Sequence, residues 1–378
     1  MNNSSIFARN RIVFPFHQNT YNCLSNKNEL SLTEPDAYCQ KWFAENHDLN
    51  HFFFTKSCTQ SLELSIMLLD LPEGAEVIMP SYAFVSLANA VNNMGCNVVF
   101  VDCEKDTMNI DPLAIKAAIS PKTKAVISIN YGGVSCDYQK IKEICTDNQL
   151  YLIEDNAHGV LGKYKNDYLG TQGDISTFSF DYLKNFTCFQ GGGIAINNKD
   201  LLERFYIVSE FGTNRRTYLN GKGNFYEWVG RGTNALVAAP LISLLAPQLE
   251  IAHDIVKQFN SNWTHYQRQL QALEKKGLIE LSKTPQYAER SAHMFWFKTA
   301  NLEERTRLIK HLAKKGVTSM SHYVPLHSSK YGQQVAEFRG SDNFTSQESQ
   351  KLIRLPLYYS LRSQEIEKIV DSVNSFYL

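Results

Sequence analysis

The sequence predicts an α/β domain with a mostly parallel β-sheet, followed by a smaller α+β domain. Between about residues 57 and 197, apolar runs rich in β-branched and aromatic residues alternate with helical stretches, as in a parallel sheet covered by helices. After about residue 248, one long amphipathic helix and shorter elements follow. Because 378 residues exceed what a single core usually serves, we expect two domains, at residues 1–250 and 251–378.

The apolar runs place the strands of the large domain in chain order. We expect them at Glu76–Met79, Asn97–Val101, Ala125–Ile129, Leu150–Ile153, Ile175–Phe180 and Gly193–Ile196. Helical periodicity fills most of the gaps, for example at Ser61–Leu69 and Pro112–Ile119. In the small domain we expect the long helix at Ile251–Lys275, a strand at Met294–Phe297, and helices at Leu302–Lys315 and Ser363–Phe376.

Composition excludes several classes of protein. The 38 basic and 38 acidic side chains balance, which argues against a nucleic-acid binder, because phosphate-backbone affinity needs clustered Lys and Arg. The eight cysteines form no CxxC pair or zinc-ligand spacing, so we expect no metal site, no disulfide framework and a reducing compartment. No signal-peptide pattern opens the chain, and the most apolar run, 235–246, is too short to span a bilayer. These features predict a cytoplasmic protein with no membrane partner.

The stretch Ser57-Cys58-Thr59 joins an apolar run to the start of a helix. A helix start offers unpaired N–H groups and the positive end of the helix dipole, which together hold a phosphate. The alternative interpretation is a simple helix N-cap made by Ser57 or Thr59.

Two further polar features follow strand ends. Glu154 and Asp155 end a buried-looking strand, where acids face the ligand site of a parallel sheet; they equally suit a helix cap or a salt bridge. Lys184 follows the strand at Ile175–Phe180 in aromatic and apolar company, with three glycines soon after. A lysine in a partly dry pocket becomes a nucleophile for carbonyls, whereas the alternative is a solvated loop lysine.

Together, the three features match the needs of pyridoxal phosphate. Its phosphate requires N–H donors, its pyridine nitrogen requires an anion, and its aldehyde requires an amine. A flat aromatic side chain should cover the ring, and Tyr82 and Phe84 stand just after another strand. The glycines near Lys184 would let the backbone approach the cofactor closely.

At these residues the sequence resembles the DegT/DnrJ/StrS family of sugar-nucleotide aminotransferases, and most of all the bacterial transaminases that act on dTDP-4-keto-6-deoxyglucose. The resemblance runs from about residue 50 to the end, and is carried by "PSYAFVSLANA", "FVDCEKDTMNID", "IEDNAHG", "FSFDYLKN", "GTNRR", "AHMFWF", "HYVPLH" and "RLPLYYSL". It implies the aspartate-aminotransferase fold, fold type I of the pyridoxal-phosphate enzymes. It also implies a nucleotide-sugar substrate, an amino-acid donor and a role in surface polysaccharide synthesis, such as that of the O-antigen of lipopolysaccharide.

The resemblance gives each matching position of the cofactor site a role. Lys184 matches the lysine that carries the aldehyde, Asp155 the acid paired with the pyridine nitrogen, and Phe84 the aromatic stacked on the ring. His158 stands where sugar aminotransferases usually have Gln, near the ring hydroxyl. The residues matching phosphate ligands are Cys58, Thr59 and Ser179.

Other matching positions concern the substrate and the partner subunit. Asn234 matches an asparagine that reaches the partner subunit's phosphate, which implies a homodimer with shared active sites. The positions that the resemblance assigns to the substrate are Asn214, Arg215, His322, Tyr323 and His327.

The chain departs from the family pattern at several positions near the expected pocket. "NKNELSLTEPD" replaces a glycine-bearing turn, Asn130 replaces a frequent His, and Gln190 a frequent Glu. Ala238-Ala239-Pro240 replaces a polar run, where we expect Pro240 to perturb a helix start. These departures leave open a different substrate or a catalytically weak relative.

The expected reaction is a ping-pong transamination from glutamate to C4 of the keto sugar, with Lys184 as the acid and base that moves the proton. Three alternatives remain. A non-catalytic relative is one. A sugar dehydratase of the same fold is disfavoured because those enzymes replace the lysine with His. A nicotinamide enzyme has only "GRGTNA", residues 230–235, which closes no clear strand.

Overall fold

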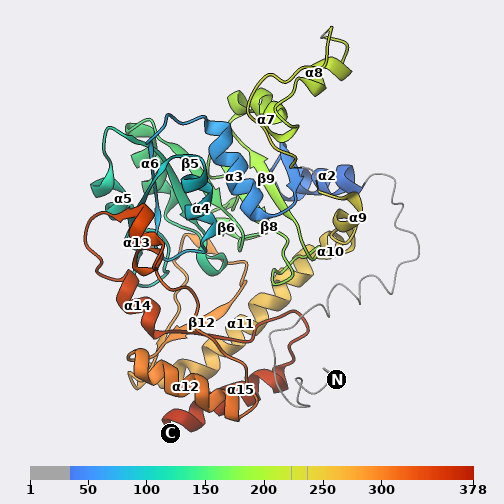
Figure 1. Cartoon of the computed structure of the whole chain (residues 1–378). Helices are drawn as coiled ribbons and strands as arrows, with labels where there is room; N and C mark the ends of the chain where they lie inside the picture. The colour runs from blue at the N-terminus through green and yellow to red at the C-terminus, as the bar shows by residue number, and fades with distance from the viewer. Residues whose placement is uncertain (1–34, 223, 236) are drawn as a thin grey trace, which may run out of the picture.

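The computed structural model of the chain describes residues 35–222, 224–235 and 237–378. "NKNELSLTEPD", apart from its last two residues, therefore lies outside the described residues. The large sheet has eight strands in the order β1-β9-β8-β5-β4-β2-β3-β13 (Figure 1). Their bounds in that order are Phe52–Thr55, Gly192–Ile196, Ile175–Ser179, Tyr151–Asp155, Thr123–Ile129, Glu76–Pro80, Asn97–Val101 and Ala336–Phe338.

The six predicted strands are confirmed to within two residues at each end, and the sheet is mostly parallel. From β8 to β13 every neighbouring pair is parallel, whereas β9 and β1 close one edge in antiparallel pairing. Because parallel strands share one direction, their carboxyl ends meet along one edge of the sheet. The edge strands β1 and β13 were not among the predicted strands.

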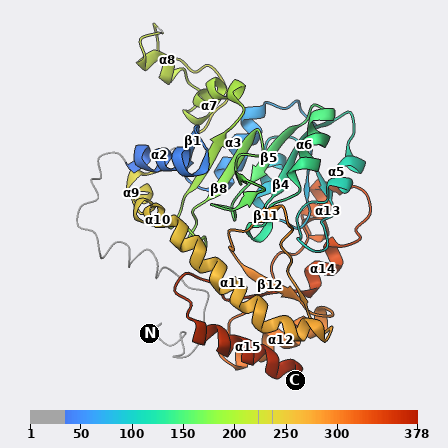
Figure 2. The ribbon, with the colours of Figure 1, turned by 180° about the vertical axis from the view of Figure 1, so that it is seen from behind.

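Helices cover both faces of this sheet. Val77 and Met79 of β2 pack with Leu62 of α3 (Cys58–Leu69) on one face, together with α4 (Ser86–Asn93) and α7 (Leu202–Ser209). Ile78 packs on the other face with α5 (Pro112–Ala118) and α6 (Tyr138–Asp147), which Figure 2 shows from behind. This alternation of neighbours with a period of two buries both faces, as expected for parallel strands that read as continuous apolar runs.

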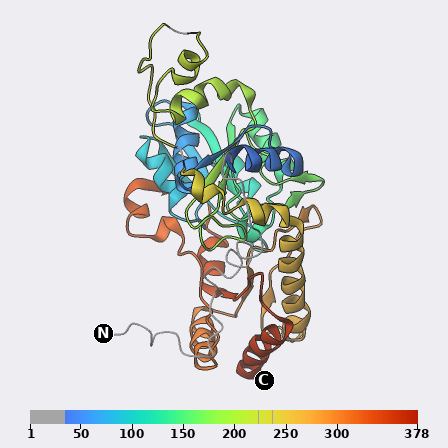
Figure 3. The same cartoon turned by 90° about the vertical axis from the view of Figure 1, so that its right-hand side faces the viewer.

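The C-terminal part forms a second layer around a small antiparallel sheet. Helix α11 (Ala252–Lys275) runs down one side of the molecule and links the two parts (Figure 3). Its apolar face packs against a sheet of order β10-β12-β14 (Glu280–Leu281, Phe295–Lys298, Leu352–Leu355). The helices that complete this part are α12 (Leu302–Lys314), α14 (Thr345–Lys351) and α15 (Ser363–Tyr377).

The chain after residue 250 also returns to the large sheet. Strand β13 pairs in parallel with β3, and Arg339 beside it donates two hydrogen bonds to the Glu76 carboxylate at 2.9 and 3.0 Å. The predicted division at residue 250 stays a prediction, but segments beyond it are built into the large layer.

The short helices between the two parts differ from expectation in one respect. Pro240 lies in the first turn of α9 (Ala239–Ile242), where a missing N–H interrupts no helical hydrogen bond, so it fits the helix start rather than perturbing it. Helix α10 (Ala246–Glu250) follows, and α2 (Pro35–His47) packs against both. Helix α8 (Arg215–Leu219) projects from the body as part of an arm, residues 211–222 and 224–233 (Figure 1).

Two further observations concern the chain as a whole. Seven cysteines lie in the described residues, and none of these seven forms a disulfide. Within residues 35–378, apart from the two gaps, no helix is long and apolar enough to cross a membrane.

Candidate active site

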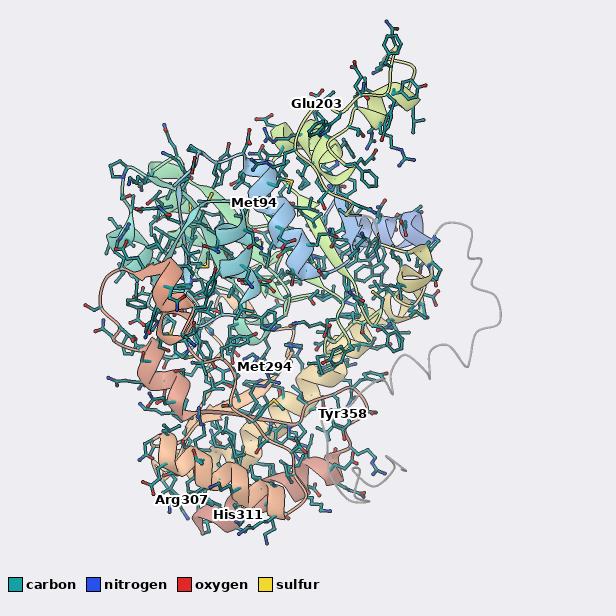
Figure 4. The ribbon with its side chains drawn as sticks, viewed as in Figure 1. Met94, Glu203, Met294, Arg307, His311 and Tyr358 are labelled. Carbon is teal, nitrogen blue, oxygen red and sulfur yellow. The ribbon has the colours of Figure 1, made fainter. Side chains whose placement is uncertain are left out.

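A cavity of about 630 Å³ lies between the carboxyl ends of the large sheet and the C-terminal part. The start of α3, the ends of β5 and β8, and the loop after β8 form one wall. The other wall comes from residues 293–294, 320–323 and 354–358. Met294 and Tyr358, which belong to this second wall, are labelled in Figure 4 between the large layer and the lower helices.

The start of α3 provides the predicted cradle of N–H groups. The Ser57 hydroxyl caps the helix by accepting from the N–H of Gln60 at 3.1 Å, so the N-cap interpretation is correct for Ser57. The cap leaves the first two N–H groups, those of Cys58 and Thr59, without an intrahelical partner, and both residues line the cavity. The Thr59 hydroxyl bonds to that of Ser86 at 2.7 Å. Capping and anion binding are therefore compatible here.

A glycine brings strand β9 into contact with this cradle. A Cβ on Gly192 would lie 2.2 Å from the carbonyl carbon of Ser57 and 2.4 Å from the nitrogen of Cys58. The backbone of β9 thus supports the first turn of α3 from behind. Ser179, at the end of the neighbouring strand β8, lines the same cavity and adds a hydroxyl.

Asp155 and Glu154 point to opposite sides of β5. Asp155 lines the cavity and accepts from the N–H of Ala157 at 2.9 Å, and burial raises its pKa to about 6. Glu154 instead accepts from the N–H groups of Gly170 at 2.6 Å and Gln172 at 2.9 Å. It also accepts from the Asn130 amide at 2.8 Å, so the Asn130 departure faces this structural carboxylate and not the cavity.

Cys58 lies between the cradle and Asp155. Its thiol is 3.9 Å from the Asp155 carboxylate and 3.7 Å from the Thr177 hydroxyl. Burial, followed by the Asp155 charge, raises the pKa of this thiol, so it is neutral at pH 7.

Lys184 lies in the loop after β8 and lines the cavity. Its N–H donates to the carbonyl of Asp181 at 3.0 Å, which folds the loop back over the strand end. Burial lowers the pKa of the amine, although the nearby Cys58 and Asp155 oppose the shift. The amine is thus not solvated as an ordinary loop lysine, but the expected apolar company is only partial, since Tyr182 and Leu183 are themselves exposed.

Phe84 supplies a flat surface at the mouth of the cavity. Its side chain is 55% exposed although it lines the cavity, and its ring centroid lies 6.3 Å from that of Tyr323. Tyr82, the other candidate from the sequence, is 1% exposed and packs against Tyr131 inside the large layer. Of the two, Phe84 is therefore the one whose ring is available to a ligand.

Three histidines line the cavity, His158 on the first wall and His293 and His322 on the second, and burial is the main cause that lowers the pKa of each. His322 bonds through Nδ1 to the Tyr131 hydroxyl at 2.8 Å and stacks on Tyr323. The ring of His158 stacks on that of His293 at a centroid distance of 4.3 Å. His293 was not identified from the sequence, although it lies in the quoted block "AHMFWF"; no residue pattern set it apart from a core histidine.

The predicted substrate and partner residues fall into two groups. His322 and Tyr323 line the cavity. His327 does not: it bonds through Nδ1 to the Ser81 hydroxyl at 2.6 Å and through Nε2 pairs with Asp342 at 3.3 Å, which ties the chain to the end of β2. The residues that also lie outside the cavity of their own chain are Asn214, Arg215 and Asn234, on or beside the arm.

Gln190 and Arg354 add an amide and a guanidinium group to the cavity. Gln190, the departure from a frequent Glu, lines the cavity. Arg354 of β14 also lines it, and its positive charge contributes to the lowered pKa of His322. With Lys184, it is one of two basic side chains other than histidine that line the described cavity.

The residues present fit pyridoxal phosphate. The helix start and Ser179 suit a phosphate, the Asp155 carboxyl suits a protonated ring nitrogen, and the Lys184 amine suits an aldehyde. The Nδ1 atom of His158 is buried and has no hydrogen-bond partner among the described residues, as expected of a group that awaits a ligand.

The sequence as a whole matches the model of the DegT/DnrJ/EryC1/StrS aminotransferase family over residues 21–374. GDP-perosamine synthase of Escherichia coli O157:H7 is 30% identical over 354 residues, which cover 90% of each chain. The spore coat polysaccharide biosynthesis protein SpsC of Bacillus subtilis (strain 168) is 27% identical over 349 residues, which cover 88% of this chain and 87% of SpsC.

Solved structures share the fold. PseC of Helicobacter pylori, an aminotransferase involved in the biosynthesis of pseudoaminic acid, superposes with a TM-score of 0.85 at 20% identity, over 97% of this chain and 99% of the other. The putative sugar aminotransferase Spr1654 of Streptococcus pneumoniae in its PLP form gives a TM-score of 0.83 at 21% identity, over 97% and 98% of the two chains. These structures confirm the predicted α/β fold of type I.

Proposed function

The chain belongs to the DegT/DnrJ/EryC1/StrS aminotransferase family, and we propose that it transfers the amino group of glutamate to C4 of dTDP-4-keto-6-deoxyglucose. At the coarser level it is a pyridoxal-phosphate-dependent sugar aminotransferase of nucleotide-sugar metabolism. The observation that supports the proposal most is the meeting of Lys184, Asp155 and the start of α3 in one cavity. We propose a cytoplasmic enzyme that supplies an amino sugar to surface polysaccharide, such as O-antigen.

The described residues divide the work of the proposed reaction. When bound, the cofactor supplies an aldehyde that takes up the amino group and a ring that accepts electrons as a C–H bond breaks. The N–H groups of Cys58 and Thr59 would hold the phosphate, Phe84 would cover the ring, and Asp155 would keep the ring nitrogen protonated.

Lys184 would carry the aldehyde and then move the proton. Because burial lowers the pKa of its amine, the neutral form is more accessible than in a solvated lysine. In its neutral form the amine would take the proton from the carbon of the amino-acid donor and pass it to the cofactor carbon. With the keto sugar it would take a proton from the cofactor carbon and give it to the sugar carbon. The same side chain thus serves as base and acid at a single position in the cavity.

The direct test is a product assay on the purified protein. The protein, pyridoxal phosphate and glutamate are incubated with dTDP-, UDP- and GDP-linked keto sugars, and amino sugars are detected by mass spectrometry. We expect the largest rate with dTDP-4-keto-6-deoxyglucose. A preference for a GDP-linked sugar would favour the alternative suggested by the similarity to GDP-perosamine synthase.

The alternative of a non-catalytic relative is tested by absorption. A visible cofactor band that bleaches on addition of glutamate supports transamination. A band that persists with glutamate and with every other amino acid supplied would contradict the proposal, as would a protein that takes up no cofactor.

We also propose a homodimer with shared active sites, because Asn214 and Arg215 of the arm, and Asn234 beside it, lie outside the cavity of their own chain. The arm exposes large apolar side chains, among them Trp228 at 82% and Phe225 at 72%, which a partner surface would cover.

Mixing two inactive variants tests this arrangement. One variant is Lys184→Ala and the other is Arg215→Ala/Asn234→Ala, and each should be inactive alone. In a mixed dimer, one of the two sites combines the intact Lys184 of one chain with the intact arm of the other. Since equal mixing makes about half of the dimers mixed, it should restore about a quarter of wild-type activity. No recovery in dimers shown to have exchanged subunits would contradict shared sites.

A further inference from the structure

His293 presents one ring nitrogen to the cavity while the other is held by the protein. Nδ1 lies 3.0 Å from Oδ1 of Asn185, the residue next to Lys184. For Nε2 the structure shows no hydrogen bond to any described residue, although His293 lines the cavity. The imidazole therefore meets, through Nε2, the cavity that Lys184 also lines.

The hydrogen bonds around Asn185 determine which nitrogen carries the proton. The Asn185 amide nitrogen donates to the backbone carbonyl of Ser291 at 3.2 Å, and a carbonyl only accepts. This bond fixes the amide orientation, so Oδ1 faces His293 and Nδ1 must donate to it. In the neutral ring, Nε2 is then a hydrogen-bond acceptor.

The surroundings keep this ring neutral and in place. Burial lowers the pKa of His293, and the positive charges of Lys184 and Arg354 lower it further. The ring stacks on that of His158 with an interplanar angle of 17°, which fixes its plane. Ser291 is itself anchored, because its N–H donates to the carbonyl of Gly133 at 3.0 Å and its hydroxyl bonds to the carbonyl of His158.

We propose that Nε2 of His293 accepts a hydrogen bond from the sugar hydroxyl next to the keto carbon, and so selects sugars that carry this hydroxyl. The inference rests on the proposed function and adds a specificity residue to it. The reacting carbon must approach Lys184, and His293, whose ring is held by the chain neighbour of Lys184, lines the same cavity.

The chemistry of an acceptor nitrogen narrows the possible ligands. A phosphate, a carboxylate and the ketone oxygen have only acceptor atoms, so none of them pairs with Nε2. Near the reacting carbon, the hydroxyl groups are the donors that the keto sugar offers. A sugar without this hydroxyl would leave Nε2 buried and unpaired, which disfavours its binding.

The test combines enzyme variants with a deoxy substrate. Wild-type protein and His293→Phe are assayed with dTDP-4-keto-6-deoxyglucose and with its 3-deoxy counterpart. Phe keeps a flat ring against His158 but has no acceptor, and His293→Gln restores an acceptor on a flexible chain. Visible absorbance of the loaded cofactor confirms that each variant is folded and loaded.

We expect the hydroxyl to increase kcat/KM of the wild-type protein roughly 10- to 100-fold, and His293→Phe to lose that preference between the two sugars. His293→Gln should recover part of the preference. Equal losses by His293→Phe on both sugars would overturn the inference. No turnover of any keto sugar by the wild-type protein would refute the proposed function itself, and with it the inference.

A second measurement examines the tautomer without any reaction. In ¹⁵N spectra of histidine-labelled protein, with the His293 signal assigned by its loss in His293→Phe, Nε2 should show the shift of an unprotonated ring nitrogen and Nδ1 that of an N–H. Asn185→Ala should abolish this preference. A proton found on Nε2 in the wild-type protein would overturn the inference whatever the kinetics show.

Discussion

Replacing Gly192 with alanine should weaken cofactor binding through a steric clash with the backbone at the start of α3. The added Cβ would lie 2.2 Å from the carbonyl carbon and 2.6 Å from the carbonyl oxygen of Ser57, and 2.4 Å from the nitrogen of Cys58. All three atoms belong to the backbone, so no side chain can rotate away. The start of α3 must move instead, by about 0.8 Å to bring the shortest contact to 3.0 Å.

The size of the effect follows from this shift. Overpacking of a close contact costs about 1–3 kcal/mol of unfolding free energy. The same shift carries the N–H groups of Cys58 and Thr59 away from the phosphate, and hydrogen bonds to charged groups contribute roughly 1.5–3 kcal/mol each. Losing one of these hydrogen bonds raises the dissociation constant of the cofactor by about 10- to 100-fold.

The assay compares Gly192→Ala with Gly230→Ala as the matched control. A Cβ on Gly230 meets its nearest neighbour, Ile207, at 3.9 Å, so the control adds the same methyl group without a clash. Urea unfolding of the cofactor-free proteins gives stability, and equilibrium dialysis with pyridoxal phosphate gives affinity. If Gly192→Ala equals the control in both measurements, the contact between β9 and α3 does not support the phosphate site.

Three further changes test other parts of the structure. Lys184→Ala should lower turnover by at least about a thousandfold, because both the aldehyde-carrying amine and the acid–base group are removed, while urea unfolding stays unchanged; comparable turnover would remove Lys184 from the mechanism. In the cofactor-free protein the pKa of Asp155 is raised to about 6, so the carboxyl takes up a proton as pH falls through that value and can no longer pair with a protonated ring nitrogen. Cofactor affinity should therefore decrease below about pH 6 in wild type, an effect that Asp155→Asn should lack, and identical pH profiles would contradict the pairing. The Asp102 carboxylate accepts hydrogen bonds from the N–H groups of residues 343–345. Asp102→Ala leaves these groups unpaired and should reduce the unfolding free energy by roughly 3–5 kcal/mol, whereas the exposed control Asp371→Ala should change it little. Similar unfolding curves for the two variants would refute this role of Asp102.

The sequence predicted the site best where local pattern and chemistry coincide. Strands buried on both faces give apolar runs that end abruptly, and the polar residue after each run then marks the ligand edge, as it did for Asp155 and Lys184. The residue pattern alone did not separate Glu154 from Asp155. The resemblance selected Asp155, and the structure shows that these adjacent residues of a strand point to opposite faces. Strands β1 and β13 escaped prediction because β1 was read only as the apolar lead to Ser57, and β13 is a three-residue edge strand with little pattern of its own.

Only part of the second wall was predicted, namely His322 and Tyr323 through the resemblance, because contacts between distant residues place this wall. Asp102, at the end of β3, accepts hydrogen bonds from the N–H groups of residues 343–345 and from the Thr345 hydroxyl at 2.6 Å. His327 bonds to Ser81 at the end of β2. Both contacts attach the C-terminal chain to the carboxyl edge of the sheet, at the ends of β2 and β3, and β5 and β8 of the same sheet carry the first wall.

His327 was assigned to the substrate because its whole segment matches a substrate-binding block, although His327 itself lies outside the cavity. The "HYVPLH" segment resembles a substrate-binding block as a whole, but its first two residues line the cavity and its last one holds the block in place. His322 and Tyr323 therefore keep a fixed position relative to Phe84 and Asp155, whereas Arg354 and Tyr358 belong to the small sheet and the loop after it. Met320, two residues before His322, forms a β-bridge with Arg354, so the same segment also links the small sheet to the strand ends.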